Sequence, residues 1–253
     1  KQVFILDMDG TVYLGDSLIK GADGFVEKLR EQGKEVLFFT NNASKVPKYY
    51  VEKLNRLGIP ADRKDIVTSG DVTIKYLKTS FSGKRVYLVG TPMLEQSFRD
   101  EGIKLVEDNA DIVVVSFDLT MTYEKISRAC TLIRNGAVFL ATHMDYNCPV
   151  ENGFIPDCGA ICAMVEASTG VRAKFLGKPC TETIEMILSI TGVSKEKLAI
   201  IGDRLYTDMA MGIKNKVTSI LVLSGETDIE DVEKSDIKPD YVFDSLKKVS
   251  KVL

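Results

Sequence analysis

Four consecutive apolar residues, 3–6, lie near the start of the chain and lead directly into two aspartates and a glycine. An unbroken apolar run of this length is typical of a buried strand in a parallel sheet, because both faces of such a strand are covered. In open α/β sheets, ligands bind beyond the carboxyl ends of the strands. Asp7 and Asp9 therefore occupy a position where catalysis is common, and Gly10 permits a tight turn beside them. A single motif of this kind is equally consistent with a polar turn.

Further polar motifs follow apolar runs later in the chain. They are Thr40-Asn41-Asn42 after residues 36–39, Gly177-Lys178-Pro179 before a helical pattern, and Gly202-Asp203 after residues 198–201, with Asp208 five residues beyond Asp203. Runs with strand character alternate with helical patterns along the chain. This alternation predicts βαβ units and a parallel sheet, and therefore an α/β fold.

Composition excludes several classes of function. A net charge of -3 without a dense Lys/Arg cluster argues against a nucleic-acid partner. No apolar run approaches the roughly 20 residues that a membrane span needs, and the first residues show no signal-peptide pattern. Five scattered cysteines and one histidine argue against a zinc site. Reduced cysteines favour a cytoplasmic location.

The alternating pattern starts again near residue 80. Three predicted strands (86–90, 112–115 and 138–141) and two predicted helices (123–134 and about 159–168) follow, and none of the polar motifs lies among them. The chain is long enough for a core that carries an inserted domain. We therefore expect a core made of residues 1–79 and 176–253, with residues 80–175 forming an inserted α/β unit.

The order of these motifs resembles the haloacid dehalogenase (HAD) superfamily of phosphotransferases, most closely its NagD-like, p-nitrophenyl phosphatase branch. The likeness runs the length of the chain and rests on residues 7–13, 40–44, 90–92, 141–142, 177–179, 202–208 and 220–225. It implies a Rossmann-like, doubly wound parallel-sheet core with an inserted α/β cap domain over the active site. It also implies hydrolysis of small-molecule phosphate monoesters through an aspartyl-phosphate intermediate. Relatives often dimerise, so a homodimer is a further expectation.

The resemblance implies a role for each motif. Asp7 would be the nucleophile, and Asp9 the general acid and then the general base. Lys178 would neutralise charge, while Thr40 would offer its hydroxyl, and Asn41 its backbone N–H, to phosphate oxygens. The expected phosphate-binding set is Gly10, Thr40, Asn41, Asn42 and Lys178. For Thr40 and its neighbours, the alternative is an ordinary Thr/Asn turn.

Four carboxylates are expected to converge at this site: Asp7, Asp9, Asp203 and Asp208. They would repel one another without a cation, and an all-oxygen ligand set points to Mg²⁺. The resemblance implies that Asp7 and Asp203 bind the metal through side chains, Asp9 through its carbonyl, and Asp208 through a water. The alternative for Asp208 is a helix cap beside Thr207.

The segment after residue 142 is a candidate substrate loop. His143, Tyr146 and Asn147 could contact the leaving group, or the segment could be an ordinary exposed loop. The chain departs here from the Asn-Pro-Asp that is common in relatives, because His143 and Met144 stand in its place. The identity of the substrate therefore stays open among small phosphorylated metabolites.

Three other activities are weighed against a phosphatase. A phosphomutase would share the aspartyl phosphate and stays open. A dehalogenase needs neither the second carboxylate nor Mg²⁺, so Asp9 and Asp203 disfavour it. A non-catalytic sensor of phosphorylated ligands on the same fold is disfavoured because Asp7, Asp9, Lys178 and Asp203 are all present.

Overall fold

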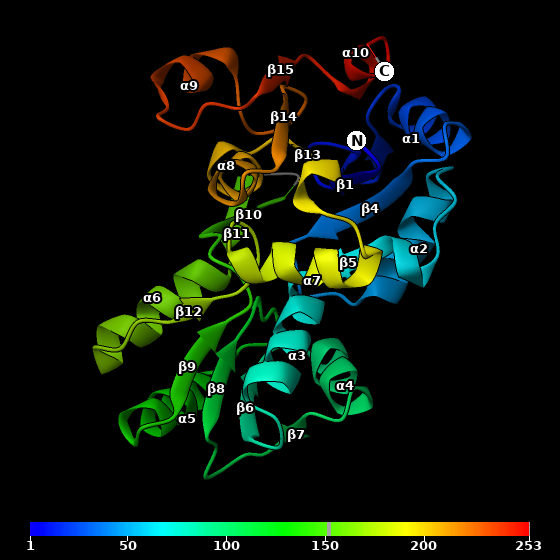
Figure 1. The fold of residues 1–253 in the computed structure, drawn as a ribbon. Helices are drawn as coiled ribbons and strands as arrows, with labels where there is room; N and C mark the ends of the chain where they lie inside the picture. Colours follow the sequence, from blue (N-terminus) through cyan, green and yellow to red (C-terminus); the bar gives the residue numbers. More distant parts are fainter. Residues whose placement is uncertain (151–152, 253) are drawn as a thin grey trace. The chain divides into compact units, whose positions relative to one another are not determined.

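A computed structural model describes residues 1–150 and 153–252 of the chain (Figure 1). The chain forms two compact units, which are described here one at a time. Unit 1 comprises Lys1–Thr40, Pro47–Val67 and the chain from Lys178 onward. Unit 2 comprises Asn41–Val46 and Thr68–Gly177.

A six-stranded sheet with the order β15-β14-β13-β1-β4-β5 forms the centre of unit 1. Its strands are β1 (Val3–Asp7), β4 (Glu35–Thr40), β5 (Ile66–Thr68), β13 (Leu198–Gly202), β14 (Thr218–Val222) and β15 (Tyr241–Phe243). The chain runs outward from β1 through β4 to β5, then returns to β13 on the other side of β1 and runs outward again. The order in which the chain adds strands therefore reverses between β1 and β13, which makes the sheet doubly wound.

The apolar runs of the sequence are the central strands of this sheet. Residues 3–6 in β1 are at most 2% exposed, and residues 198–201 in β13 are at most 1% exposed. Parallel pairing sets Ile5 opposite Leu37 on one side and opposite Ile200 on the other. Both faces of these strands are covered, which is why they carry no polar alternation.

Helices lie against both faces of the unit 1 sheet. The main ones are α1 (Ala22–Glu31), α2 (Pro47–Arg56), α7 (Thr181–Thr191), η3 (Leu205–Met209), α8 (Ala210–Asn215), α9 (Ile229–Lys234) and α10 (Leu246–Val249). Phe25 and Leu54 from α1 and α2 pack in one apolar cluster with Phe38 of β4. Leu205 and Met209 of η3 pack against Leu221 of β14. The remaining short elements are β2 (Tyr13–Leu14), β3 (Ser17–Leu18), η1 (Arg63–Asp65) and η2 (Lys195–Lys197).

Unit 2 is a second α/β unit with its own five-stranded sheet, in the order β12-β9-β8-β6-β7. Its strands are β6 (Arg85–Val89), β7 (Lys104–Leu105), β8 (Ile112–Val115), β9 (Val138–Ala141) and β12 (Lys174–Phe175). Its helices are α3 (Ser69–Ser80), α4 (Pro92–Asp100), α5 (Tyr123–Arg134) and α6 (Cys158–Thr169). A separate two-stranded sheet pairs β10 (Asn147–Val150) antiparallel with β11 (Gly153–Pro156).

The α/β class and the doubly wound sheet are therefore as the sequence predicts. The unit boundaries differ from the expected ones, because Asn41–Val46 and α3 pack within unit 2. The Ser69 hydroxyl at the start of α3 donates a hydrogen bond to the Asn41 carbonyl, which ties these two segments together. At the other end, the change of unit falls between Gly177 and Lys178, close to the expected residue 176.

Within the described residues, no helix has the length and apolar character required to cross a membrane.

Candidate active site

The sheet of unit 1 brings three predicted site residues to one edge. Asp7 is the last residue of β1, Thr40 is the last of β4, and Asp203 directly follows β13. Pairing of Leu6 with Ile201 and of Asp7 with Phe39 puts these three strand ends at the same level. They lie at the point where the winding of the sheet reverses, which is the usual ligand site of a doubly wound fold.

Lys178 lies in the interior of this site and is only 2% exposed. Its ammonium group donates to the Asp7 carboxylate and, at 2.7 Å, to Asp208 Oδ1. The Phe39 carbonyl lies 3.5 Å from the same nitrogen. One buried cation thus contacts two carboxylates that are about 200 residues apart in the chain.

Three carboxylates converge around this lysine. Asp7, Asp203 and Asp208 each offer an oxygen, and these oxygens lie within 4.8 Å of one another in a buried setting. Burial raises the pKa of Asp7 well above its usual range, against the opposing effect of Lys178, while Asp208 adds to the rise. Burial and then Asp208 raise the pKa of Asp203 to about 6. Carboxylate oxygens gathered in this way suit a hard divalent cation, so the donor set fits Mg²⁺.

The Asp203 carboxylate accepts hydrogen bonds from Thr11 and Glu226, to which the sequence analysis gave no role. Thr11 Oγ1 donates to Asp203 Oδ1 at 3.2 Å, and the Glu226 backbone N–H donates to Asp203 Oδ2 at 2.7 Å. A Cβ atom on Gly225 would lie 1.9 Å from Asp203 Oδ2, and one on Gly10 would lie 2.3 Å from it. The two glycines therefore let the backbone approach this carboxylate closely. In the sequence, the only indication of these contacts to Asp203 was the pair of short motifs around residues 10 and 225.

Asp9 lies beside this cluster in a different environment. Its carboxyl is not one of the three gathered oxygen donors found within the described residues. Burial raises its pKa, while Lys53 and Arg204 act in the opposite direction. Lys53 is 7% exposed, and its ammonium lies 3.7 Å from the centroid of the Tyr13 ring. Sequence reasoning missed Lys53, because a lysine on an amphipathic helix is ordinarily a solvated residue.

The predicted phosphate-binding residues fall in both units. Gly10, Thr40 and Lys178 belong to unit 1, whereas Asn41 and Asn42 belong to unit 2. Thr40 and Asn41 are buried. The Asn42 side chain instead caps its own turn, because Asn42 Oδ1 accepts hydrogen bonds from the Ser44 N–H at 3.0 Å and the Ser44 hydroxyl at 2.7 Å.

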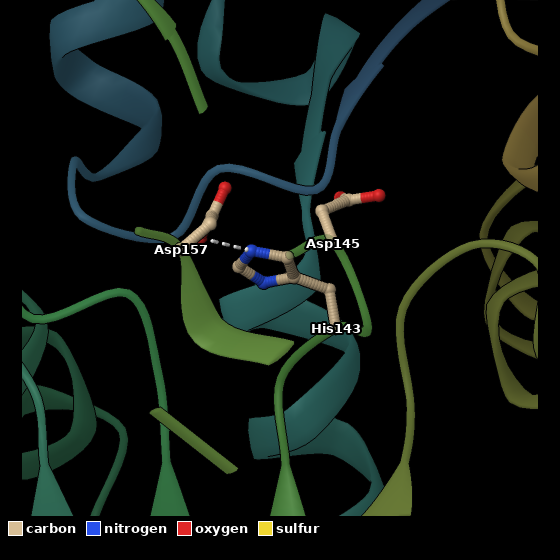
Figure 2. Close-up of side chains that lie close together, drawn as sticks. All are labelled: His143, Asp145 and Asp157. Atoms are coloured by element: carbon tan, nitrogen blue, oxygen red, sulfur yellow. Dashed lines mark hydrogen bonds and ion pairs between the residues drawn. The ribbon is translucent and has the colours of Figure 1, made fainter. Parts of the chain in front are cut away.

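The three predicted substrate-loop residues of unit 2 have different surroundings. His143 is fully buried, and its Nε2 lies 2.8 Å from Asp157 Oδ1, a hydrogen bond that Figure 2 marks with a dashed line. Tyr146 is 60% exposed and lines an open pocket of about 580 Å³ together with Glu166 and Arg172. Asn147 is exposed at the start of β10. Of these three side chains, Tyr146 and Asn147 are therefore accessible to a substrate, whereas His143 is not.

A doubly wound sheet, a strand-end aspartate beside a buried lysine, and an inserted α/β unit together define phosphotransferases of the HAD type. Comparison with known families agrees. Residues 4–104 match the family described as haloacid dehalogenase-like hydrolase, and residues 175–249 match a second family described as HAD-hydrolase-like.

Full-length relatives give the same result. The acid sugar phosphatase of Staphylococcus saprophyticus is 37% identical over 100% of this chain and 98% of its own. The crystal structure of 4-nitrophenylphosphatase from Thermotoga maritima has a TM-score of 0.96 at 45% identity, covering 99% of this chain and 96% of its own. NagD from Escherichia coli K-12 has a TM-score of 0.91 at 27% identity, covering 98% and 97%. The chain therefore belongs to the haloacid dehalogenase family of hydrolases and is a NagD-like phosphatase, which confirms the resemblance seen in the sequence.

Proposed function

We propose that this phosphatase hydrolyses phosphate monoesters of small metabolites in two steps through an aspartyl phosphate on Asp7. The observation that carries the proposal is the buried contact of Lys178 with Asp7 and Asp208 at the reversal point of the sheet. Unit 1 would be the catalytic core and unit 2 the cap.

In the first step, an Asp7 oxygen attacks phosphorus and the bond from phosphorus to the leaving oxygen breaks. Asp9 donates its proton to that leaving oxygen. In the second step, Asp9 accepts a proton from a water, which attacks the same phosphorus and releases Asp7 and inorganic phosphate. Splitting one difficult displacement into two easier ones is the benefit of the covalent intermediate.

Other groups stabilise charge during both steps. Lys178 neutralises part of the charge on Asp7 and on the phosphoryl oxygens. The Thr40 hydroxyl and the Asn41 N–H donate to those oxygens. Phosphoryl transfer depends mainly on such positioning and charge stabilisation.

We propose Mg²⁺ as the cofactor. Asp7 and Asp203 would hold it through side chains, Asp9 through its carbonyl and Asp208 through a water. When bound, the cation would offset the charge of the phosphoryl group and of the gathered carboxylates. The support is the all-oxygen donor set and the raised pKa of the buried acids. We expect excess chelator to abolish turnover and added Mg²⁺ to restore it.

The substrate class is proposed from the relatives and from unit 2. Names such as acid sugar phosphatase put sugar phosphates first among the candidates. Nucleoside monophosphates, glycerol phosphate and pyridoxal phosphate follow. The exposed Tyr146, which lines a pocket of unit 2, carries a ring and a hydroxyl that suit a ring-bearing or hydroxylated leaving group. A small phosphorylated metabolite is thus the expected partner, while nucleic acid and membrane are not. The homodimer and the cytoplasmic location stay predictions.

Turnover of p-nitrophenyl phosphate by Asp7→Asn tests the nucleophile. We expect the variant to fold and to lose activity, while the wild type binds fluoroberyllate as a mimic of its aspartyl phosphate. The exposed Asp16→Asn serves as the matched control and should behave as the wild type. Near-normal turnover by Asp7→Asn would refute the assignment. Product analysis with and without an acceptor sugar separates hydrolysis from phosphomutase activity.

A further inference from the structure

Unit 2 contains a buried polar cluster of which the reaction described above uses one group, the backbone N–H of Asn41. We call it the junction cluster, and it comprises Asn41, Ser69, His143, Asp145 and Asp157 (Figure 2 shows the last three). All five side chains are buried. Asn41 directly follows Thr40, and Ser69 lies one residue past the point where the chain enters unit 2 again.

Hydrogen bonds join the cluster into one network. His143 Nε2 lies 2.8 Å from Asp157 Oδ1, and His143 Nδ1 lies 3.0 Å from Thr142 Oγ1 and 3.5 Å from Ser69 Oγ. Ser69 Oγ donates to the Asn41 carbonyl. The network thus leads from Asp157 through the histidine ring to the backbone of Asn41.

A second connection reaches the Asn41 side chain. Asn41 Nδ2 donates to Asp145 Oδ2 at 2.9 Å. Asp145 lies two residues beyond His143 on the same loop, so the position of the loop determines where this acceptor lies. Asn41 is therefore held both at its carbonyl and at its side chain.

The groups around His143 favour the charged form of its ring. Burial disfavours the charged ring, but Cys158 and Asp157 outweigh burial and raise the pKa of His143 to about 9. Both ring nitrogens can then donate near neutral pH. Asp157 also accepts a hydrogen bond from the Cys158 N–H at 2.6 Å, at the first turn of α6. The pair therefore anchors the loop of His143 to a helix.

The contact between His143 Nε2 and Asp157 Oδ1 has the length of a hydrogen bond and is shorter than the usual spacing of two zinc ligands. Two ligands at about 2.0–2.1 Å from a tetrahedral zinc lie about 3.3 Å apart. The separation of 2.8 Å between His143 Nε2 and Asp157 Oδ1 is instead an ordinary hydrogen-bond length.

The junction cluster includes Asn41 and contacts Gly177, the two unit 2 residues that precede or follow predicted phosphate-binding residues of unit 1 in the chain. The Gly177 N–H donates to the Thr142 carbonyl at 2.7 Å. A Cβ atom on Gly177 would lie 2.6 Å from Asn41 Oδ1, so these two residues are in close contact. Asn41 is peptide-bonded to Thr40, and Gly177 to Lys178. Holding Asn41 and Gly177 therefore restricts the backbone at both of those neighbours.

We propose that His143 and Asp157 are positioning residues for phosphate binding, which act by holding Asn41 and Gly177 beside Thr40 and Lys178. This rests on the proposed function of Thr40, Asn41 and Lys178 in phosphate binding. Unlike a contact with the leaving group, such a role affects every substrate equally, because phosphate is common to all of them.

The test measures binding of inorganic phosphate to Asp157→Asn by titration calorimetry in the presence of Mg²⁺. The KM values for p-nitrophenyl phosphate and for a sugar phosphate are measured alongside. We expect phosphate to bind about tenfold more weakly and both KM values to rise by the same factor, since one disturbed charged hydrogen bond commonly has an effect of this size. His143→Gln tests the same link from its other end, so the outcome does not depend on one variant folding.

Asp118→Asn is the matched control. Asp118 is a buried carboxylate of unit 2 that pairs with Lys125 at 2.8 Å and is not part of the junction cluster. We expect this variant to lose thermal stability and to keep the phosphate affinity of the wild type. If Asp157→Asn lowers the melting temperature but leaves the phosphate affinity unchanged, the contact of His143 with Asp157 has only a structural role and the proposal is wrong.

A double-mutant cycle tests whether the pair acts through Asn41. We expect Ser69→Ala combined with Asp157→Asn to bind phosphate no more weakly than Ser69→Ala alone, because Ser69 links the His143 ring to the Asn41 carbonyl. Multiplied losses, or a change in KM for the sugar phosphate only, would refute the positioning role. Titration calorimetry measures phosphate binding even in a protein that does not turn over substrate. If the wild type binds phosphate but does not hydrolyse esters, the proposed function fails while the positioning proposal is still tested.

Discussion

Replacement of Lys178 by methionine tests how the carboxylates of the site are stabilised. Lys178 is 2% exposed and its ammonium group contacts Asp7 and Asp208. Methionine fills similar space but carries no charge. The variant therefore leaves two buried carboxylates without their neighbouring cation, beside the third carboxylate of Asp203.

The expected loss of stability is large. Removing one partner of a buried ion pair destabilises a protein by about 3–5 kcal/mol, out of a total stability of about 5–15 kcal/mol. For a chain of this length, each kcal/mol shifts the melting temperature by about 2–4 °C, so we expect a fall of about 6–20 °C.

The pH dependence has a definite sign. Burial already raises the pKa of Asp7, and removal of Lys178 raises it further. A carboxyl whose pKa is higher in the folded state than the ordinary 3.8 destabilises the fold increasingly as pH rises above that value. The loss caused by Lys178→Met should therefore be largest near neutral pH and small near pH 4.

Thermal unfolding with chelator and with added Mg²⁺ measures these effects. Mg²⁺ should narrow the gap between variant and wild type, because a bound cation takes over part of the charge that the lysine supplied. Lys125→Met, which breaks a more exposed pair with the single carboxylate of Asp118, should cost less. A loss below about 1 kcal/mol, as for a surface ion pair, or an equal loss at pH 4 and pH 7 would contradict this reasoning.

Four further outcomes are expected. Asp9→Asn should lose about 10²–10⁴-fold in kcat on alkyl phosphates and less on p-nitrophenyl phosphate, whose leaving group needs little protonation; steady-state kinetics on both substrates would show equal losses if the acid role is wrong. Asp203→Ala should weaken Mg²⁺ binding measured by calorimetry, and an unchanged affinity would remove it from the metal site. Arg85 lowers the pKa of Asp111 to about 2 through hydrogen bonds, so its stabilising effect is complete above pH 3.8 and lost as pH falls through 2; urea unfolding of Arg85→Met should differ from the wild type at pH 6 and converge with it near pH 2. Tyr146→Ala should alter kcat/KM on the best metabolite more than on p-nitrophenyl phosphate, and an unchanged substrate ranking would place selectivity elsewhere in unit 2.

The strands and the strand-end residues of unit 1 could be predicted from the sequence, because both signals are local. An unbroken apolar run marks a central strand, and a polar residue directly after it must lie at the carboxyl edge of the sheet. This is why Asp7, Thr40 and Asp203 were placed correctly at strand ends without knowledge of the sheet order. The inward position of Lys178 was also expected, from its place between Gly177 and a proline.

Local patterns were insufficient where a residue's surroundings come from distant parts of the chain. The α3 helix directly follows strand β5 of the unit 1 sheet in the sequence, and only its contacts assign it to unit 2. The paired strands β10 and β11 each contain a proline and show no strand alternation, so their pairing could not be predicted from the sequence.

The same limit applies to the two most informative buried charges, Lys53 and His143. From the sequence alone, Lys53 is expected on the solvated face of a helix, and His143 in a substrate loop or an ordinary exposed loop. The tertiary structure sets Lys53 over the Tyr13 ring and His143 against Asp157. The burial and charge state of a side chain depend on the groups that packing brings around it. Those groups come from segments that are distant in the sequence, and no local sequence pattern shows which distant segments will meet.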